Sequence, residues 1–247
     1  MLDADAAGAS CAAVRGLFWP LSCRHFGEVY WERRYHLTRA SPASALLGAA
    51  EGAERVLASS DLPRLAELWQ FRVRADHAQA VVLRPGSFSH DADGWPPGSL
   101  LGAASMRKAH AANRTVVLHN VELYHRPIGR LTLALSSHFG VYAQANVYWS
   151  PPAVSLAVHA HQDAQSVFIL QCEGRKVWTL LSPPDRWRLR HNQRGKAGDV
   201  APESELGEPT GSYELAPGDV LFIPRGVYHH TSTASSVRAL APLTRHP

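Results

Sequence analysis

Short alternating apolar runs, separated by turn residues, dominate the second half of this chain of 247 residues. Successive side chains of a strand point to opposite faces, so runs of this length and alternation are typical of half-buried strands. The runs are ANVYWS, LAVHAHQD, SVFILQ, KVWTLL, SYELA and DVLFIP, with PP, EG, PP and PG between them. Strands at this spacing predict an all-β barrel or sandwich in the second half, with helices packed outside it.

Helical periodicity appears before these strands. It predicts an amphipathic helix at about 24–33, a second over DLPRLAELWQFRV and a third around 127–138. Residues 84–114 are rich in Gly, Pro, Ser and Asp and have no sustained period, which predicts a long loop, and RTVVLHNVEL after it predicts a strand. The fold class expected is mainly β with flanking helices.

Composition favours one soluble domain inside a cell. Hydrophobic residues make up 45% of the chain, enough to bury a large core, and the net charge of +4 comes with no long basic block. The three cysteines, Cys11, Cys23 and Cys172, form no CxxC pair in a chain too large to need disulfides, so we expect them unpaired in a reducing compartment. No apolar stretch approaches the roughly 20 residues that span a bilayer, so no membrane contact is expected.

A histidine and an aspartate are two residues apart in the run LAVHAHQD. On a strand, His161 and Asp163 would point to the same face and present two metal ligands. With 14 histidines and 21 acidic residues, about one such pair arises by chance, so the pair alone identifies no site. A third ligand could come from His229 or His230, which follow the strand DVLFIP, and two histidines with one carboxylate form the facial triad of non-haem Fe(II) oxygenases.

A lysine follows the His-x-Asp pair in the run KVWTLL. An ammonium facing a barrel interior is costly unless an anion pairs with it, so Lys176 predicts an acidic ligand such as the dicarboxylate 2-oxoglutarate. We expect this run to pair with SVFILQ across a turn that contains Gly174. The alternation also allows Lys176 to point outward, in which case it needs no ligand.

Several segments in the same order resemble the JmjC-domain 2-oxoglutarate oxygenases. The residues that carry the resemblance are HQD, FILQCEGRKVWTLLSPP and LAPGDVLFIPRGVYHH, with LFWPL, HFGEVYWERR, VVLHNVEL and ANVYWSPP upstream. The PRG before the last histidines is most similar to the ribosomal oxygenase branch, whose members hydroxylate histidine or arginine side chains of ribosomal proteins. The resemblance covers about residues 17–240 and implies a double-stranded β-helix, which is a jelly-roll or cupin-like barrel.

The resemblance also assigns roles to residues of this chain. It implies that His161, Asp163 and His229 bind Fe(II), with His229 preferred over His230 because the family's ligand stands three residues after the PRG glycine. It implies that Lys176 pairs with the distal carboxylate of 2-oxoglutarate. Asn146 and Tyr148 match positions that line the same pocket.

The activity implied is hydroxylation of a protein side chain with Fe(II), 2-oxoglutarate and dioxygen. A ribosomal protein is the expected substrate, and a histone, whose methyl-lysine would be demethylated, is the second candidate. The expected location is the nucleus or nucleolus in a eukaryote and the cytoplasm in a bacterium.

The resemblance divides the chain into three parts. Residues 1–15 are expected to be a disordered leader, 16–115 an N-terminal helical and β segment packed on the barrel, and 116–247 the JmjC double-stranded β-helix. Two departures stand out. Ala164 replaces a second acidic residue, and the chain ends soon after the last ligand strand, where the branch continues with a dimerisation region and a winged helix, so the oligomeric state is left open.

Two alternative functions stay open from the residues alone. A cupin-type binding protein could keep the barrel without oxygen chemistry, since barrels host many functions. The basic charge and the segment RWRLRHNQR could give a weak RNA contact, although no RNA-binding motif with aromatic platforms appears.

Overall fold

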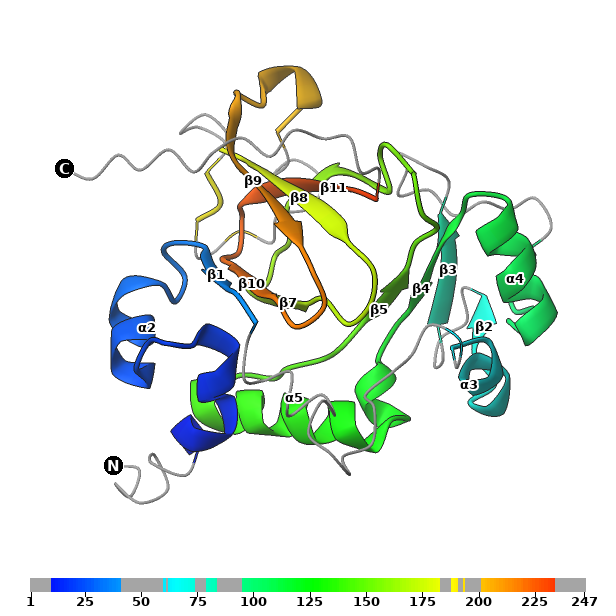
Figure 1. Cartoon of the computed structure of the whole chain (residues 1–247), viewed down its shortest axis with the longest axis horizontal. Coiled ribbons are helices and arrows are strands. Elements are labelled where there is room, and N and C mark those ends of the chain that lie inside the picture. Colours follow the sequence, from blue (N-terminus) through cyan, green and yellow to red (C-terminus); the bar gives the residue numbers. More distant parts are fainter. Residues whose placement is uncertain are drawn as a thin grey trace.

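The computed structural model describes residues 10–40, 60, 62–73, 79–83, 95–182, 188–190, 193 and 201–233. Three sheets and the helices around them make up this part of the chain (Figure 1). Within these ranges no helix has both the length and the apolar character that crossing a membrane requires.

Two antiparallel sheets come mainly from the second half of the sequence, as predicted. One has the order β1-β10-β7 and the other β6-β11-β8-β9. The strands of the first sheet are β1 (His36–Thr38), β10 (Val220–Ile223) and β7 (Val167–Leu170). The strands of the second sheet are β6 (Val158–His161), β11 (Tyr228–Ser232), β8 (Lys176–Leu181) and β9 (Pro209–Leu215).

Strand β10 explains why a fully apolar run lies at the centre of the fold. Leu221 and Ile223 face the second sheet and share a core with Leu180 and Leu215. The alternate residues of β10 face the other way and pack against helices in a second core, in which Phe222 contacts Phe26 with ring centroids 4.9 Å apart. Because both faces are buried, the sequence of β10 shows no polar alternation.

Two helices cover the outer face of the first sheet. Helix α2 (Cys23–Val29) begins where the Ser22 hydroxyl accepts a hydrogen bond from the His25 N–H, and α5 (Arg126–Phe139) ends at Gly140, whose φ of 66° suits glycine. Figure 1 shows α5 running below the sheets and α2 at their edge. The helices predicted at 24–33 and around 127–138 are therefore confirmed, the first being shorter than expected.

A third sheet of order β2-β3-β4-β5 packs with two helices around a separate core (Figure 1). Its strands are β2 (Arg72–Val73), β3 (Gln79–Leu83), β4 (Thr115–Leu118) and β5 (Val147–Trp149). Helices α3 (Leu62–Leu68) and α4 (Ala103–Ala111) contribute Ala66 and Met106 to this core. Three 3₁₀ helices complete the described elements: η1 (Arg15–Phe18), η3 (Val121–Leu123) and η6 (Glu203–Glu205).

Two sequence-based expectations about these elements were wrong. Strands β7 and β8 do not pair across Gly174, because β7 pairs with β10 and β8 pairs with β9 and β11 in the other sheet. Part of the predicted loop at 84–114 is helix α4, since an alanine-rich segment has high helix propensity and buries Met106 and Ala109; residues 84–94 lie outside the described ranges.

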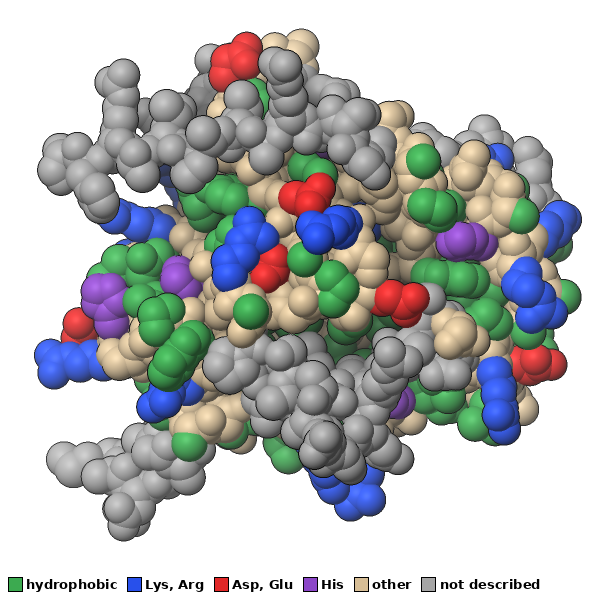
Figure 2. Space-filling model, in the orientation of Figure 1, with side chains coloured by type: hydrophobic (Ala, Val, Ile, Leu, Met, Phe, Trp, Pro, Cys, Tyr) green, Lys and Arg blue, Asp and Glu red, His purple; other side chains and the backbone are tan. Residues whose placement is uncertain are grey.

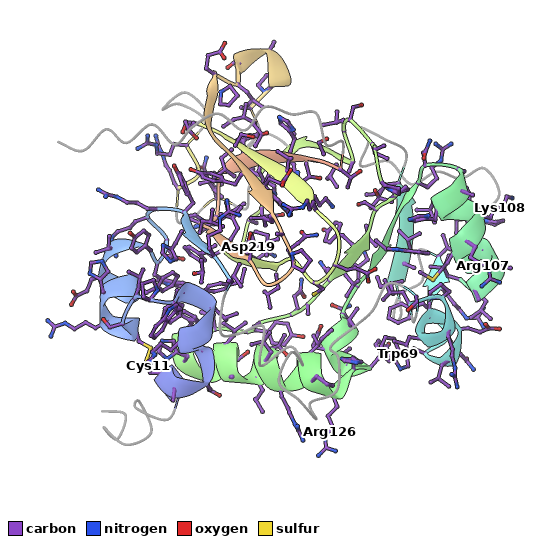
Figure 3. The ribbon with its side chains drawn as sticks, viewed as in Figure 1. Cys11, Trp69, Arg107, Lys108, Arg126 and Asp219 are labelled. Atoms are coloured by element: carbon purple, nitrogen blue, oxygen red, sulfur yellow. A yellow bond between two sulfur atoms is a disulfide. The ribbon has the colours of Figure 1, made fainter. Side chains whose placement is uncertain are left out.

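The N-terminal region is ordered where the structure describes it. Residues 1–9 of the predicted leader lie outside the described ranges, but residues 10–14 are helical and Val14 is fully buried. Cys11 forms a disulfide with Cys23, visible beside α2 in Figure 3, so the expectation of unpaired cysteines was wrong for these two. The apolar contacts of Val14 and Phe26 in one core bring the two segments side by side, which the linear spacing does not reveal.

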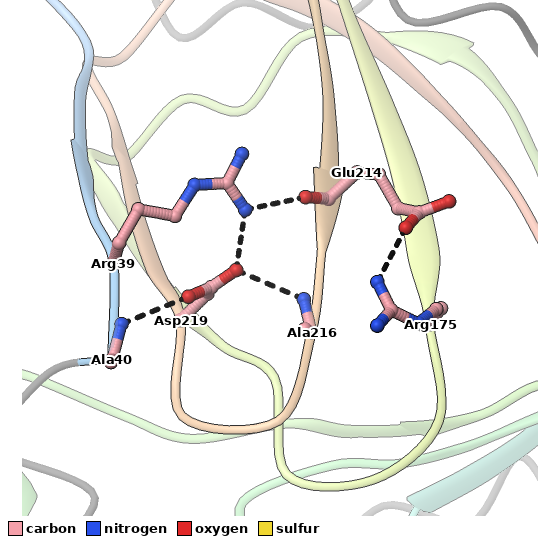
Figure 4. Close-up of polar contacts among 6 residues, drawn as sticks. All are labelled: Arg39, Ala40, Arg175, Glu214, Ala216 and Asp219. Atoms are coloured by element: carbon pink, nitrogen blue, oxygen red, sulfur yellow. Dashed lines mark hydrogen bonds and ion pairs between the residues drawn. The ribbon is translucent and has the colours of Figure 1, made fainter.

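Asp219 ties the turn before β10 to the end of β1 (Figure 4). Its two carboxylate oxygens accept hydrogen bonds from the backbone N–H groups of Ala40 and Ala216, both at 3.0 Å, and from the Arg39 guanidinium at 2.5 Å. Burial alone would raise the pKa of Asp219, but these hydrogen bonds and the Arg39 charge together lower it below its usual value. The ionised carboxylate therefore stabilises the fold.

We predict that Asp219→Asn lowers the free energy of unfolding by about 1–3 kcal/mol at pH 7, because one acceptor oxygen is replaced by a donor that faces other donors. Because the folded-state pKa of Asp219 is lowered, its carboxylate contributes its full stabilisation at pH values above the unfolded-state pKa of about 3.9. That stabilisation is lost as the pH falls through the folded-state pKa. Urea denaturation at pH 7 and pH 3 measures the difference, which should shrink in acid. Glu28→Gln, on an exposed helical pair, is the control; an equal loss at both pH values would contradict the prediction.

Candidate metal and diacid site

His161 and His229 lie directly opposite each other on neighbouring antiparallel strands. The register of β6 and β11 pairs the two residues, and their ring centroids are 4.2 Å apart. Paired residues of an antiparallel ladder share a face, so both imidazoles point to the same side of the sheet. The pairing, and not proximity in sequence, brings these two predicted ligands together.

Asp163 completes the cluster just beyond the end of β6. Its backbone carbonyl accepts a hydrogen bond from the Gly226 N–H at 2.9 Å, which continues the contact between the two chain segments past the strand. Its carboxylate oxygens lie 3.9 Å from His161 Nε2 and 3.7 Å from His229 Nε2. One ligand atom from each of the three residues lies within 4.8 Å of the others, a spacing that can hold one metal ion.

The orientation of His229 is fixed by a backbone carbonyl. Its Nδ1 lies 3.0 Å from the Val227 carbonyl oxygen, which can only accept, so Nδ1 carries the proton and Nε2 keeps its lone pair toward Asp163. Burial, followed by the neighbouring His161, lowers the pKa of His229 to about 3. The imidazole is therefore neutral at pH 7, as a metal ligand must be.

The Pro-Arg-Gly segment holds the loop that carries Asp163. The Arg225 side chain donates to the Ala164 carbonyl at 3.2 Å and to the Gln193 carbonyl at 2.7 Å. Gly226 has a φ of 79°, and a Cβ there would lie 2.7 Å from the Leu189 Cβ, so no other residue fits. The sequence pattern marked this segment only by resemblance; the structure gives it a positioning role.

Lys176 faces the same side of the sheet as the two histidines. His229 pairs with Leu180 on β8, and Lys176 lies four residues earlier in the same strand, so the alternation puts all three on one face. The lysine is 8% exposed, and its ammonium donates to the Ser150 hydroxyl at 3.1 Å. Within the described ranges no carboxylate lies within ion-pair distance of it. Burial lowers its pKa to about 8.

Tyr148 and Asn146 border this lysine from β5 and the residue before it. The Lys176 Nζ lies 5.8 Å from the centre of the Tyr148 ring. Tyr148 as a whole is 47% exposed, but desolvation of its hydroxyl and the nearby charge of Asp163 raise the pKa of that hydroxyl to about 12, and its side chain is hydrogen bonded to Asn146. The Asn146 Oδ1 also accepts from the Asn120 N–H at 3.3 Å. All six sequence-predicted site residues therefore lie in one region.

Three residues of this region escaped the sequence analysis. Ser150 binds the lysine ammonium, Arg225 holds the Asp163 loop, and Trp178 lies between the lysine and His229, with its ring 5.5 Å from the imidazole. The alternation along β8 could have placed Trp178 on the lysine's face. The contacts of Ser150 and Arg225 join distant segments and left no local signal.

The arrangement combines a metal-ligand cluster with a buried cation on one sheet face. Two imidazoles and one carboxylate occupy one side of a metal and leave its other coordination positions for ligands. The buried ammonium without an acidic partner favours an anion. A small acid that both coordinates a metal and carries a second carboxylate matches both features.

The sequence model of the JmjC domain matches residues 121–244, half of the chain. The chain therefore belongs to the JmjC-domain family. Among curated proteins it is similar to ribosomal oxygenase 2 of Rattus norvegicus, with 35% identity over 130 residues, which are 53% of this chain and 26% of the relative. It is also similar to human ribosomal oxygenase 1, with 28% identity over 229 residues, which are 91% of this chain and 32% of the relative.

A third relative is the bifunctional lysine-specific demethylase and histidyl-hydroxylase NO66 of Dictyostelium discoideum, 34% identical over 126 residues, which are 51% of this chain and 24% of the relative. The chain thus spans about a quarter to a third of the length of these relatives. Among solved structures, a ribosomal oxygenase from Escherichia coli in complex with cobalt and 2-oxoglutarate shares the fold, with a TM-score of 0.51 and 20% identity over 87% of this chain and 49% of that one.

We predict that Lys176→Met raises the free energy of unfolding at pH 7 by up to about 3 kcal/mol, because it removes a buried charge whose pKa is lowered to about 8. Between pH 8 and 10 the folded wild type releases the Lys176 proton, whereas the unfolded chain keeps it up to about pH 10.4. The free energy of unfolding of the wild type therefore rises in this range, and the advantage of the variant shrinks. Urea denaturation at pH 7 and 10 measures it. Lys108→Met, on the surface of α4, is the control, and a variant less stable than the wild type at pH 7 would refute the prediction.

Proposed function

We propose that His161, Asp163 and His229 bind Fe(II). The convergence of their ligand atoms within 4.8 Å carries this proposal. The donor set fits the metal, since two neutral imidazoles and one carboxylate are the facial triad of non-haem Fe(II) oxygenases. The hydrogen bond from His229 Nδ1 to the Val227 carbonyl supplies the second interaction that orients a ligating histidine.

The second part of the proposal is that Lys176 binds the distal carboxylate of 2-oxoglutarate. His229 pairs with Leu180 on β8. Lys176 lies four residues before Leu180 in that strand, a distance of about 13 Å. The histidine and lysine side chains cover part of that span, and the five-carbon diacid covers the rest. Ser150 and Tyr148 border the ammonium, and the Asn146 side chain is hydrogen bonded to that of Tyr148.

Bound Fe(II), with 2-oxoglutarate and dioxygen, supplies the oxidising power to hydroxylate an unactivated carbon. The chain's own residues bind and orient. The triad occupies one side of the metal, Lys176 and its neighbours fix the direction of the diacid, and Arg225 keeps the Asp163 loop in place. No side chain is required as a nucleophile or general base in this scheme.

A protein side chain is the proposed substrate, with histidine or arginine of a ribosomal protein first. The support is the similarity to ribosomal oxygenases of Rattus norvegicus and Homo sapiens. The similarity to the bifunctional demethylase and hydroxylase of Dictyostelium discoideum supports a histone methyl-lysine as the second candidate.

The fold proposal accompanies the functional one. We propose that the strands of the two sheets that enclose Leu180 and Leu221, apart from β1, form the double-stranded β-helix of a JmjC core within residues 116–247. We further propose that 16–115, to which β1 belongs, is the N-terminal segment packed on it. The support is that the family match begins at residue 121 and that the two sheets share a core.

Two other functions have less support. A cupin-type binding protein without oxygen chemistry would leave the buried Lys176 and the triad without a common role. For RNA binding, most of the segment 186–194 lies outside the described ranges. On the face shown in Figure 2, the Lys and Arg side chains lie in small groups with acidic side chains among them and form no continuous basic patch.

The activity is tested by the conversion of 2-oxoglutarate to succinate in the presence of Fe(II). We expect turnover by the wild type and a loss of about 100-fold or more in His229→Ala and Asp163→Ala, because a metal ligand is removed. His230→Ala is the matched control, since His230 is adjacent in sequence and points to the opposite face of β11. Turnover that survives Asp163→Ala, or that is lost equally in His230→Ala, would contradict the ligand assignment.

The substrate is identified by mass spectrometry of ribosomal proteins and histones incubated with the wild type and with His161→Ala. A gain of one oxygen on one peptide with the wild type alone supports hydroxylation. Loss of a methyl group with release of formaldehyde supports demethylation instead. Turnover of 2-oxoglutarate with neither change would reject both substrate classes.

A further inference from the structure

His119 lies directly after β4 and faces the same side of the third sheet as Tyr148. The register of β4 and β5 pairs Leu118 with Val147, and continuing it by one residue sets His119 opposite Asn146. Side chains alternate along a strand, so His119, Asn146 and Tyr148 share one face. Leu118 and Val147 point the other way, into the core that α3 and α4 cover. His119 is therefore turned away from that core and lies on the face that borders the candidate site.

The side-chain amide of Asn146 links these residues by hydrogen bonds. Its Oδ1 accepts from the Asn120 backbone N–H at 3.3 Å, at the point where the chain leaves β4 with a φ of 55° at Asn120. This contact turns the carbonyl end of the amide toward Asn120 and leaves the NH₂ end for the Tyr148 side chain, to which Asn146 is hydrogen bonded. An NH₂ group only donates, so the Tyr148 oxygen is the acceptor.

The His119 imidazole is hydrogen bonded to the same amide. Burial lowers the pKa of His119, and this hydrogen bond acts in the opposite direction, as a contact with an acceptor oxygen does. The neutral imidazole has one N–H group, and that group donates to Asn146 Oδ1. A carbonyl oxygen has two lone pairs, so Oδ1 accepts from His119 and from Asn120 at once.

This order of donors leaves the Tyr148 proton unused. Because Tyr148 accepts from Asn146, its own O–H group must donate elsewhere, and the described part of the chain supplies no acceptor for it. The Tyr148 ring lies 5.8 Å from the Lys176 Nζ, and the charge of Asp163 acts on its hydroxyl. The unused donor is thus held near both parts of the candidate site.

We infer that His119 is a positioning residue for the proposed reaction. Its N–H group holds the Asn146 amide in one orientation, and that orientation makes the Tyr148 hydroxyl a donor to the molecule bound in the site. Without His119, the amide is held only by the long contact of 3.3 Å with Asn120. It can then turn over and present its oxygen to Tyr148, which takes up the hydroxyl proton. This inference rests on the proposed function and adds a residue that acts through Asn146.

The first test is NMR of the ligand-free protein labelled with ¹⁵N at asparagine, which needs no metal. The Asn146 side-chain signals are identified by their loss in Asn146→Asp. His119→Phe keeps a ring and removes the donor, so we expect these signals to shift. His119→Asn and His119→Gln place an amide donor near one or the other ring nitrogen, and one of them should restore the signals. Unchanged signals in His119→Phe, or signals that neither amide variant restores, would overturn the inference.

The second test measures kcat and KM for 2-oxoglutarate with Fe(II) in a double-mutant cycle. We expect Tyr148→Phe to lower kcat/KM about 10-fold, as the loss of one hydrogen bond does, and His119→Phe to lower it by a similar or smaller factor. Because His119 acts through the Tyr148 hydroxyl, adding His119→Phe to Tyr148→Phe should cost no further activity. A merely structural role for His119 would instead give losses that multiply.

His110→Phe is the matched control. It is the same substitution on the opposite side of β5, where the His110 ring stacks on that of Trp149 with centroids 4.5 Å apart. Trp149 follows Tyr148 in the strand and therefore points to the other face. We expect this variant to keep the wild-type kcat/KM and the wild-type Asn146 signals.

The outcomes separate this inference from the proposed function. If the wild type converts no 2-oxoglutarate, the proposed function fails, and the role of His119 in the reaction fails with it whatever the NMR signals show. If the wild type is active while His119→Phe or Tyr148→Phe keeps kcat/KM within twofold, the proposed function stands and this inference is overturned. Losses of the two variants that multiply in the double variant also overturn it and leave the proposed function standing.

Discussion

The site depends on one backbone pairing, that of β6 with β11. The register that sets His161 opposite His229 also fixes which face both imidazoles occupy, and the hydrogen bond from Gly226 to the Asp163 carbonyl adds the carboxylate to the same side. A slip of one residue would turn His230 toward His161 and send His229 away. The hydrophobic core between the two sheets, with Leu180 and Leu221 on opposing strands, is what holds the register.

The second constraint is electrostatic. Lys176 is 8% exposed, and in the described part of the chain its ammonium contacts a hydroxyl and aromatic rings, so its burial costs stability that the rest of the fold compensates. Under the proposed function, this loss of stability in the ligand-free protein is what favours binding of the diacid.

Sequence reasoning predicted the helices α2, α3 and α5 and the strands β4 to β10, because alternation and spacing are local signals, and it missed β1, β2, β3 and β11. The six candidate site residues rested largely on the family resemblance, and their roles stay a proposal. Sequence reasoning could not pair the strands. The apolar pattern of SVFILQ (β7) is equally compatible with pairing to β8 and with pairing to β10. Only the packing of both faces of β10 makes it the partner of β7. Contacts between distant segments, such as Lys176 with Ser150, Arg225 with Ala164 and Cys11 with Cys23, leave no periodic trace in the chain.

One guanidinium, that of Arg225, links two separate segments of the chain. Arg225 donates both to the carbonyl of Ala164, next to the candidate ligand Asp163, and to the carbonyl of Gln193. Loss of this one guanidinium would therefore release the Asp163 loop and the Gln193 carbonyl together.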